Sequence, residues 1–327
     1  MRDDAVAPVI AAMLILAAVA MVFAVFNGVY IPSLKQAAET EHLHTVETSF
    51  QQISSDIGQA VALRENSLAM SEPVQLGGGD IYLNQFRSAG PRSVINEDRP
   101  AYYLVLDTAE GPVLMNGTMV NISYNPVGNF WQDQGYRWQY GFLNVTKYGK
   151  KQAPLSYSTM AEVNNEFNGS GSLAAFAGSF GDVQYTLNQT YFQNSTPTPD
   201  NRLVFSPRPG NCSAIVLRTV NISASPDHPF ASGNGVGRLE LRTRLIAEEY
   251  YGVNSITMIS DMKPFGNATA KAWNESFSAL AERCFNNIGY NPDKDYSGES
   301  YSTYTVSQQV SPVNVTLNTL SIEIGAQ

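Results

Sequence analysis

Apolar residues crowd into the first tenth of the chain. Positions 5–34 hold no charged residue, and positions 5–30 are almost wholly Ala, Val, Ile, Leu, Met and Phe. An uncharged run of about 20 apolar residues can cross the hydrocarbon core of a bilayer as a helix. A cleaved secretory signal has a shorter apolar core and a more basic start. We therefore expect a retained transmembrane or filament-core helix over residues 5–31, preceded by a short segment at 1–4.

Beyond Pro32 the apolar residues become periodic. They recur every three or four positions, which predicts an amphipathic stalk helix over residues 32–70. Pro32 predicts a kink or break before this helix, with Ser33 as its N-cap. The stripe either packs on the protein's own C-terminal part or forms a self-associating seam. It consists of Leu43, Val46, Phe50, Ile53, Ile57 and Ala60.

After Met70 the pattern changes to short apolar and aromatic runs separated by Gly, Pro, Asn and Ser, which predicts a β-rich, sandwich-like head over residues 71–327. Asn116-Gly117 predicts a type I′ hairpin turn, and residues 267–287 predict one packed helix. The expected fold class is therefore α+β. The predicted strands are 80–86, 101–106, 113–124, 138–146, 183–192, 203–205, 214–223, 237–247, 255–260, 301–308 and 314–324.

The charge balance argues against nucleic acid as a partner. The net charge is −9, and the 20 Lys and Arg residues form no long basic run, whereas phosphate binding needs clustered cations. Only 15% of residues are charged, against about 25% in an average soluble domain. This low charge, together with 43% hydrophobic residues, predicts a folded chain.

Asn-x-Ser/Thr triplets are frequent after residue 115 and absent before it, which favours a glycosylated head outside the cell with the N-terminus inside. The alternative is that a composition rich in Asn, Ser and Thr produces the triplets by accident. The eleven candidate sites are Asn116, Asn121, Asn144, Asn168, Asn188, Asn194, Asn211, Asn221, Asn267, Asn274 and Asn314.

The chain has two cysteines, Cys212 and Cys284. An extracytoplasmic compartment permits a disulfide between them, and closing that loop would stabilise the head by about 4 kcal/mol in the chain-entropy model. Two buried free thiols are the alternative interpretation.

Candidate chemistry is sparse. Asp293, Asp295 and Ser297, followed by Gly298, match the first half of a calcium loop, but position 12 is Tyr304 rather than Glu. A plain polar turn is the favoured interpretation, so no cofactor is expected. His42 and His44 lie on opposite faces of the predicted stalk helix, and we expect both to be solvated. No nucleophile elbow, metalloprotease motif or P-loop occurs, so we expect no enzymatic activity.

The first residues resemble a known family. DDAVAPVI at positions 3–10, followed by the apolar run, is similar to the N-terminus of archaeal type IV pilins and pilin-like surface proteins, with Ala7 where Ser is usual. The resemblance covers residues 3–30. It implies a leader cut by a prepilin peptidase between Asp4 and Ala5, although the basic pair often seen there is absent. It also implies a helix that anchors the subunit in the membrane or packs among other pilin-like subunits.

These observations together predict a pilin-like, membrane-anchored archaeal cell-surface protein. Its expected role is that of a minor pilin, or of an adhesion or structural subunit with a glycosylated head. Two alternatives belong to other classes: a membrane-anchored surface binding protein that does not polymerise, and a tethered extracellular hydrolase.

Overall fold

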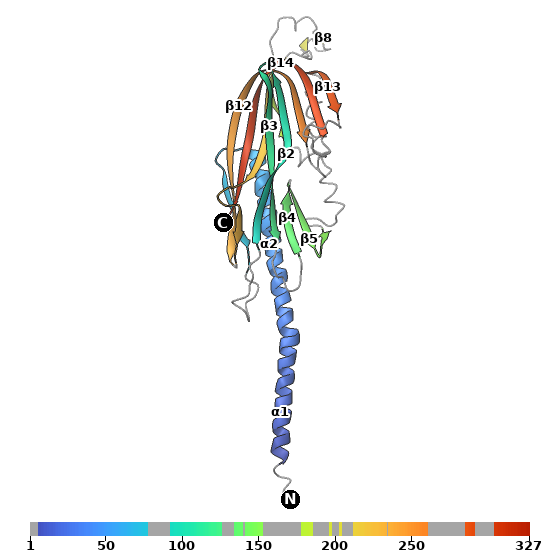
Figure 1. Cartoon of the computed structure of the whole chain (residues 1–327), viewed down its shortest axis with the longest axis vertical. Helices are drawn as coiled ribbons and strands as arrows, with labels where there is room; N and C mark the ends of the chain where they lie inside the picture. The colour runs from blue at the N-terminus through green and yellow to red at the C-terminus, as the bar shows by residue number, and fades with distance from the viewer. Residues whose placement is uncertain are drawn as a thin grey trace.

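The computed structural model describes residues 6–77, 92–125, 134–139, 141–152, 178–185, 196–197, 203–204, 212–233, 235–260, 285–291 and 304–327. Within these residues the fold is α+β, as predicted. One long N-terminal helix projects from a strand-rich head, with the N-terminus at the far tip of the helix (Figure 1).

The helix has three consecutive parts. They are α1 (Val6–Val25), a π-helical turn η2 (Phe26–Tyr30) and α2 (Ile31–Leu63). The break expected at Pro32 does not occur: Pro32 lies in the first turn of α2, and the helix reaches it without interruption from the π-helical turn. The helix ends where Arg64 adopts a left-handed conformation and donates its N–H to the Ala60 carbonyl.

Nearly all described strands belong to one sheet, in the order β6-β5-β4-β3-β2-β12-β14-β10-β7. β1 adds to β12, β11 to β2 and β13 to β14, while β8 and β9 pair separately. Only β10 and β14 run parallel among the paired strands described. The strands are β1 (Ala69–Gln75), β2 (Arg92–Thr108), β3 (Gly111–Asn125), β4 (Gln134–Gln139), β5 (Phe142–Lys147), β6 (Lys150–Gln152), β7 (Gly178–Tyr185), β8 (Thr196–Pro197), β9 (Leu203–Val204), β10 (Cys212–Ala224), β11 (Phe230–Ser232), β12 (Val236–Ser260), β13 (Phe285–Asn291) and β14 (Tyr304–Ala326).

This sheet curls strongly. The pairing of β12 with β14 shifts register between Tyr250 and Ser255, where Gly252 has a φ of 62°. As a result β3 and β10, which are not neighbours in the sheet, meet face to face: the Thr118 N–H donates to Asn221 Oδ1 at 2.8 Å. A curled single sheet accounts for all described strands except β8 and β9, so the predicted sandwich stays a prediction.

The core lies between the curled sheet and the second half of α2. All six residues of the predicted stripe are buried, at 0–2% exposure, together with inward residues of β1, β3, β4, β5, β10, β12 and β14. The structure therefore selects packing on the protein's own head over a self-associating seam. Burying a large apolar side chain stabilises a fold by about 1.5–3 kcal/mol, so the stripe fastens the helix firmly to the head.

Several predicted strand boundaries are wrong. The 138–146 run is two strands, β4 and β5, whereas 237–247 with 255–260 forms the single strand β12, and 301–308 with 314–324 falls largely in the single strand β14. Residues 80–86 and most of the predicted helix at 267–287 lie outside the described residues, and the end of that helix, from Phe285, belongs to β13.

The hairpin predicted at Asn116-Gly117 is also wrong. These residues lie within β3, and β2 turns into β3 at Ala109 and Glu110 instead. Gly117 is needed for another reason: a Cβ there would lie 2.0 Å from Cε1 and Cζ of the Tyr102 ring. Tyr102 is itself buried and donates its hydroxyl to the Val220 carbonyl at 2.9 Å. The glycine is therefore required because it leaves space for an aromatic ring, and not because it forms a turn.

Candidate functional site: a bare apolar helix

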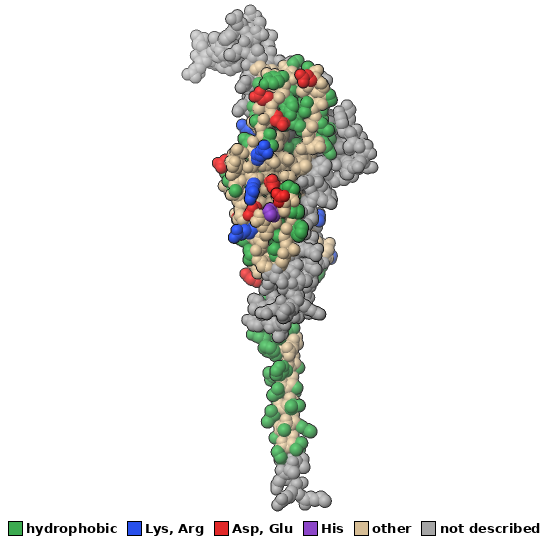
Figure 2. All heavy atoms as spheres, turned by 60° about the vertical axis from the view of Figure 1, so that its left-hand side comes forward, with side chains coloured by type: hydrophobic (Ala, Val, Ile, Leu, Met, Phe, Trp, Pro, Cys, Tyr) green, Lys and Arg blue, Asp and Glu red, His purple; other side chains and the backbone are tan. Residues whose placement is uncertain are grey.

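The first half of the long helix packs on none of the described strands of the head. Every side chain from position 8 to position 30 is exposed, with Leu16 at 74% and Met21 at 68%. Figure 2 shows apolar side chains covering the visible face of this segment and no charged side chain on it. The head, in contrast, carries a mixture of acidic, basic and polar groups on the same view.

This segment is apolar on all sides. Its residues are almost all Ala, Val, Ile, Leu, Met and Phe, with Pro8, Asn27, Gly28 and Tyr30 as the exceptions. A helix that is hydrophobic all round is normally buried in protein or lipid. Residues 8–30 span about 35 Å at 1.5 Å per residue, which exceeds a hydrocarbon core of about 30 Å.

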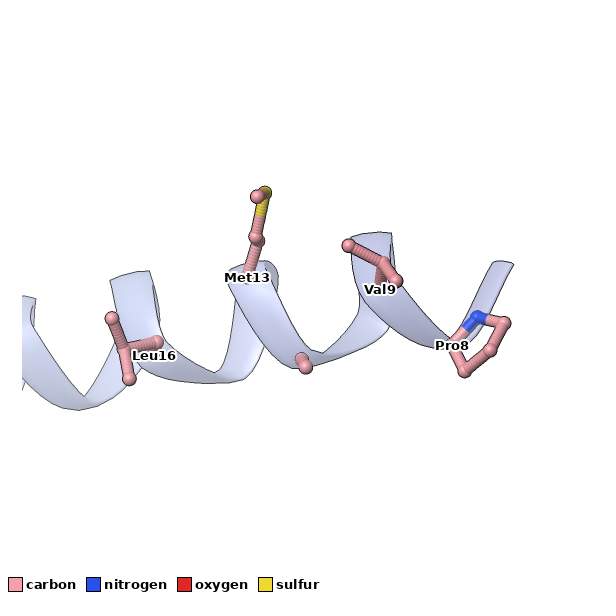
Figure 3. Close-up of a pocket in the computed structure, with 5 residues that line it drawn as sticks. Pro8, Val9, Met13 and Leu16 are labelled. Carbon is pink, nitrogen blue, oxygen red and sulfur yellow. The ribbon is translucent and has the colours of Figure 1, made fainter. Parts of the chain in front are cut away.

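Among the described residues, one helix is accordingly long and apolar enough to cross a membrane, and it lies near the N-terminus. A membrane anchor and a signal sequence both satisfy this test of length and composition. Near its start, Pro8, Val9, Met13 and Leu16 project from adjacent turns of the helix (Figure 3). The shallow depression that they line belongs to one helix face and is open to the surroundings.

The bare and packed halves meet at the π-helical turn. Ile31 donates its N–H to the Phe26 carbonyl, one residue further back than in an α-helix. A proline removes one helical donor and crowds the preceding turn, so the wider turn lets the helix continue through Pro32. Ser33 is not an N-cap as predicted: its hydroxyl donates to the Tyr30 carbonyl at 2.8 Å, and Tyr30 is already helical.

A polar cluster lies at the foot of the head. The imidazole Nε2 of His42 is 2.7 Å from the Tyr124 hydroxyl, and burial lowers the pKa of His42 below its ordinary value. The Tyr136 hydroxyl donates to the Leu43 carbonyl at 2.8 Å. His42 is thus half-buried and bonded to the head, which corrects the predicted solvated position; His44 is exposed, as predicted.

A cavity of about 220 Å³ lies inside the curled sheet beyond the end of α2. Its polar groups include the hydroxyls of Thr219 and Thr319, which are 2.9 Å apart. Arg64, at the end of α2, donates from Nη2 to the carbonyls of Thr219 at 3.1 Å and Asn318 at 2.6 Å. Burial raises the pKa of the lining residue Tyr102 to about 12. Sequence reasoning missed this cavity, because its lining comes from five strands that contribute two residues each.

The candidate glycosylation sites differ in accessibility. Asn116 and Asn314 are exposed and Asn144 is half-exposed, whereas Asn121 is only 9% exposed. Asn221 is engaged, since its Oδ1 accepts from the Thr118 N–H. The remaining candidates lie outside the described residues: Asn168, Asn188, Asn194, Asn211, Asn267 and Asn274.

The other predicted sites are only partly within the described residues. Cys212 is buried at the start of β10 and is disulfide-bonded, while Cys284 lies outside the described part. The calcium candidates Asp293, Asp295 and Ser297 and the cleavage pair Asp4 and Ala5 also lie outside it. Among the residues that are described, no group of three or more His, Cys, Asp or Glu gathers as a metal site.

Comparison with known proteins gives no relative. No protein-family model matches the chain, and no match is found among the curated proteins or the solved structures.

Proposed function

We propose that this chain is a pilin-like cell-surface subunit, with the bare helix held in the membrane or in a filament core and the head outside the cell. One observation carries the proposal: a helix that is apolar all round projects from the head with no side chain covered between positions 8 and 30. The packed half of the same helix joins the head directly to the anchor without a linker between them.

The free energy of exposure shows why this helix needs an apolar environment. Thirteen large apolar side chains on it are about half exposed or more. Each contributes about 1.5–3 kcal/mol when fully buried, so covering their exposed halves is worth about 10–20 kcal/mol. They are Val9, Ile10, Met13, Leu14, Ile15, Leu16, Val19, Met21, Val22, Phe23, Val25, Phe26 and Val29.

The pilin-like role, as opposed to a plain anchor, is supported by the resemblance of residues 3–30 to archaeal type IV pilins. In the proposed orientation the N-terminus is cytoplasmic, and the exposed Asn116 and Asn314 are available for glycosylation. Adhesion or spacing of the head from the membrane is the role proposed for the outward part.

A solitary membrane-anchored binding protein is the second candidate. It is favoured by the burial of the apolar stripe of α2, because the chain's own head already covers that stripe. Within the described helix, self-association would therefore use the bare segment, residues 8–30.

Membrane retention tests the anchor. We expect the full chain to stay in the membrane pellet after an alkaline carbonate wash, and Ile15→Lys with Val19→Lys to release it, because each charge costs about 2.5–3.5 kcal/mol at mid-bilayer. The matched control is Leu114→Lys, at an exposed apolar position of the head. Release of the unmodified chain, or retention of the double variant, would refute the anchor.

Two further measurements separate the two candidates. Mass spectrometry of the native N-terminus should find a chain beginning near Ala5 if a prepilin peptidase acts on it. A cysteine introduced by Ala17→Cys should cross-link subunits through α1 in the membrane if they polymerise. An intact N-terminus and a monomeric Ala17→Cys variant would instead select the solitary anchor.

A further inference from the structure

One segment of β12 has a strand on only one of its two sides. β1 pairs with β12 as far as Arg242, and β2 pairs with it from Val253 onward, both on the side opposite β14. Between these two partners, β12 pairs with β14 alone among the described strands. Residues 245–251 therefore form an open edge of the sheet.

The backbone of this open edge can accept another strand. Thr243 exchanges backbone hydrogen bonds with the two residues before β1, so every second residue after it turns its N–H and C=O to the same side. The Leu245 N–H donates to Asn66 Oδ1 at 3.1 Å. The outward N–H and C=O groups of the next two such residues, Ala247 and Glu249, have no partner among the described residues, and both residues are exposed.

The open edge is acidic. Glu248 and Glu249 are exposed and are the only charged residues between positions 245 and 252, since the arginines of β12 end at Arg244. Their carboxylates accept from the hydroxyls of Tyr250 at 2.8 Å and Tyr251 at 2.6 Å, and neither has a cation as partner in the described part of the chain. A hydroxyl leaves the negative charge in place, so a basic strand fits this edge best.

A basic edge lies at the other end of the same sheet. β6 is the last strand in the order, and no described strand pairs with its outer side. It is joined to β5 by a two-residue turn at Tyr148 and Gly149, whose φ angles of 50° and 71° suit a type I′ hairpin. The hairpin holds Lys147, Lys150 and Lys151 and no acidic residue, and Lys150 is exposed.

We propose that the heads of two copies of this chain join edge to edge, with β6 of one copy adding to residues 245–251 of β12 in the next. In β6, Lys150 pairs with Lys147 beside the turn, so Lys151 turns its N–H and C=O outward. These groups can exchange hydrogen bonds with Ala247 or Glu249 of the other copy. Opposed residues of paired strands carry their side chains on the same face, with Cβ atoms about 4.5–5.5 Å apart, so the lysines lie beside the glutamates.

Charge makes this contact head-to-tail. Two β12 edges would bring the glutamates of both copies together, two β6 edges would bring the lysines together, and like charges on opposed strands are destabilising. Figure 1 shows β12 and β5, the neighbour of β6, on opposite sides of the head. A copy that has used one edge therefore keeps the other, and the contact can repeat from copy to copy. It lies wholly on the head, so it goes beyond the proposed function of the bare helix.

Charge reversal tests the contact in the full chain in detergent, by sedimentation at low salt, where charge pairs are least screened. We expect the unmodified chain to associate. Glu248→Lys with Glu249→Lys, and separately Lys150→Glu with Lys151→Glu, should each lower the association constant at least about tenfold. A mixture of the two double variants should associate again, because a basic β12 edge then meets an acidic β6 edge.

Ala247→Pro tests the backbone part of the contact. Proline removes the outward N–H at an edge position, where strands tolerate it, so the variant should keep its unfolding midpoint and lose association. Asp227→Lys with Glu323→Lys is the matched control for charge. Both residues are exposed and lie in neither β12 nor the β5–β6 hairpin, so the same change of net charge should leave association intact.

The proposal fails if the unmodified chain stays monomeric, if either charge reversal or Ala247→Pro leaves the association constant unchanged, or if the mixture does not associate. Loss of association in the matched control would also overturn it, since net charge alone would then explain the result. Membrane retention is measured separately. A retained chain with monomeric heads would refute this contact alone, whereas release of the unmodified chain would refute the anchor.

Discussion

Gly117 and Tyr102 give the sharpest test of how the curled sheet is held together. In Gly117→Ala the new Cβ would lie 2.0 Å from two atoms of the Tyr102 ring, which is closer than any real carbon contact. The ring cannot swing away freely, because it is 4% exposed and its hydroxyl is bonded to the Val220 carbonyl on the facing strand β10. Tyr102 and Gly117 are paired directly across the neighbouring strands β2 and β3, so the substitution must push these strands apart or pull the ring away from Val220 of β10.

The expected cost combines two contributions. Overpacking a well-filled core costs about 1–3 kcal/mol, and loss of the Tyr102–Val220 hydrogen bond adds about 1 kcal/mol. The sum, about 2–4 kcal/mol, is a large part of a typical stability of about 5–15 kcal/mol. At about 2–4 °C per kcal/mol for a domain of this size, the midpoint should fall by about 5–15 °C.

Denaturant unfolding of the full chain in detergent measures this cost through tryptophan fluorescence. Trp138 is a suitable reporter because it is fully buried and donates from its indole to Ser54 of α2 at 2.9 Å. Gly58→Ala is the matched control: Gly58 is exposed in mid-helix with no atom near its missing Cβ, so alanine should stabilise by about 0.5–1 kcal/mol.

A double variant identifies the cause. In Tyr102→Leu the ring is gone, so adding Gly117→Ala to it should cost at least about 1 kcal/mol less than adding it to the unmodified chain. The steric explanation is refuted if the losses of unfolding free energy in the two single variants add up to that of the double variant. It is also refuted if Gly117→Ala changes the unfolding free energy as little as Gly58→Ala does.

The remaining predictions concern how the helix is fastened to the head. Arg64→Met removes two hydrogen bonds from a charged donor to the carbonyls of Thr219 and Asn318, and should lower the free energy of unfolding by about 2–3 kcal/mol. Arg242→Met, on the exposed face, should change the unfolding midpoint very little. Equal effects of the two variants would contradict an anchoring role for Arg64. Ile53→Ala, in the buried stripe, should cost about 2–5 kcal/mol, whereas Ile15→Ala on the bare helix should leave unfolding of the head unchanged in detergent.

The helices were predictable because their signals are local. The 3-4 spacing of the stripe from Leu43 to Ala60 determines which face of α2 is buried, whatever covers it, and the uncharged run determines the bare segment. The partner of a helical residue is not local, which is why His42 was misjudged. Tyr124, its hydrogen-bond partner, lies 82 positions further along the chain.

The errors in the strands have related physical causes. Asn116-Gly117 has the composition of a turn, but its glycine accommodates a ring from another strand. The polar residues from Glu248 to Gly252 suggested a loop between two strands, yet β12 continues through them and uses Gly252 to change direction. The cavity beyond Arg64 has no sequence signature, because its lining comes from two residues on each of five strands that are far apart in the sequence.

One half of the long helix is buried in the head and the other half is exposed, and this difference determines which half is available for attachment. The head already covers the apolar stripe of α2, so within the described helix the free energy available for attachment resides in the bare segment, residues 8–30. The helix is continuous through the π-helical turn, so fixing α1 also fixes α2 and the head packed on it, and the contacts of Arg64 and Trp138 hold that packing together. A variant that loosens these contacts should therefore leave membrane retention intact while freeing the head to move on its stalk.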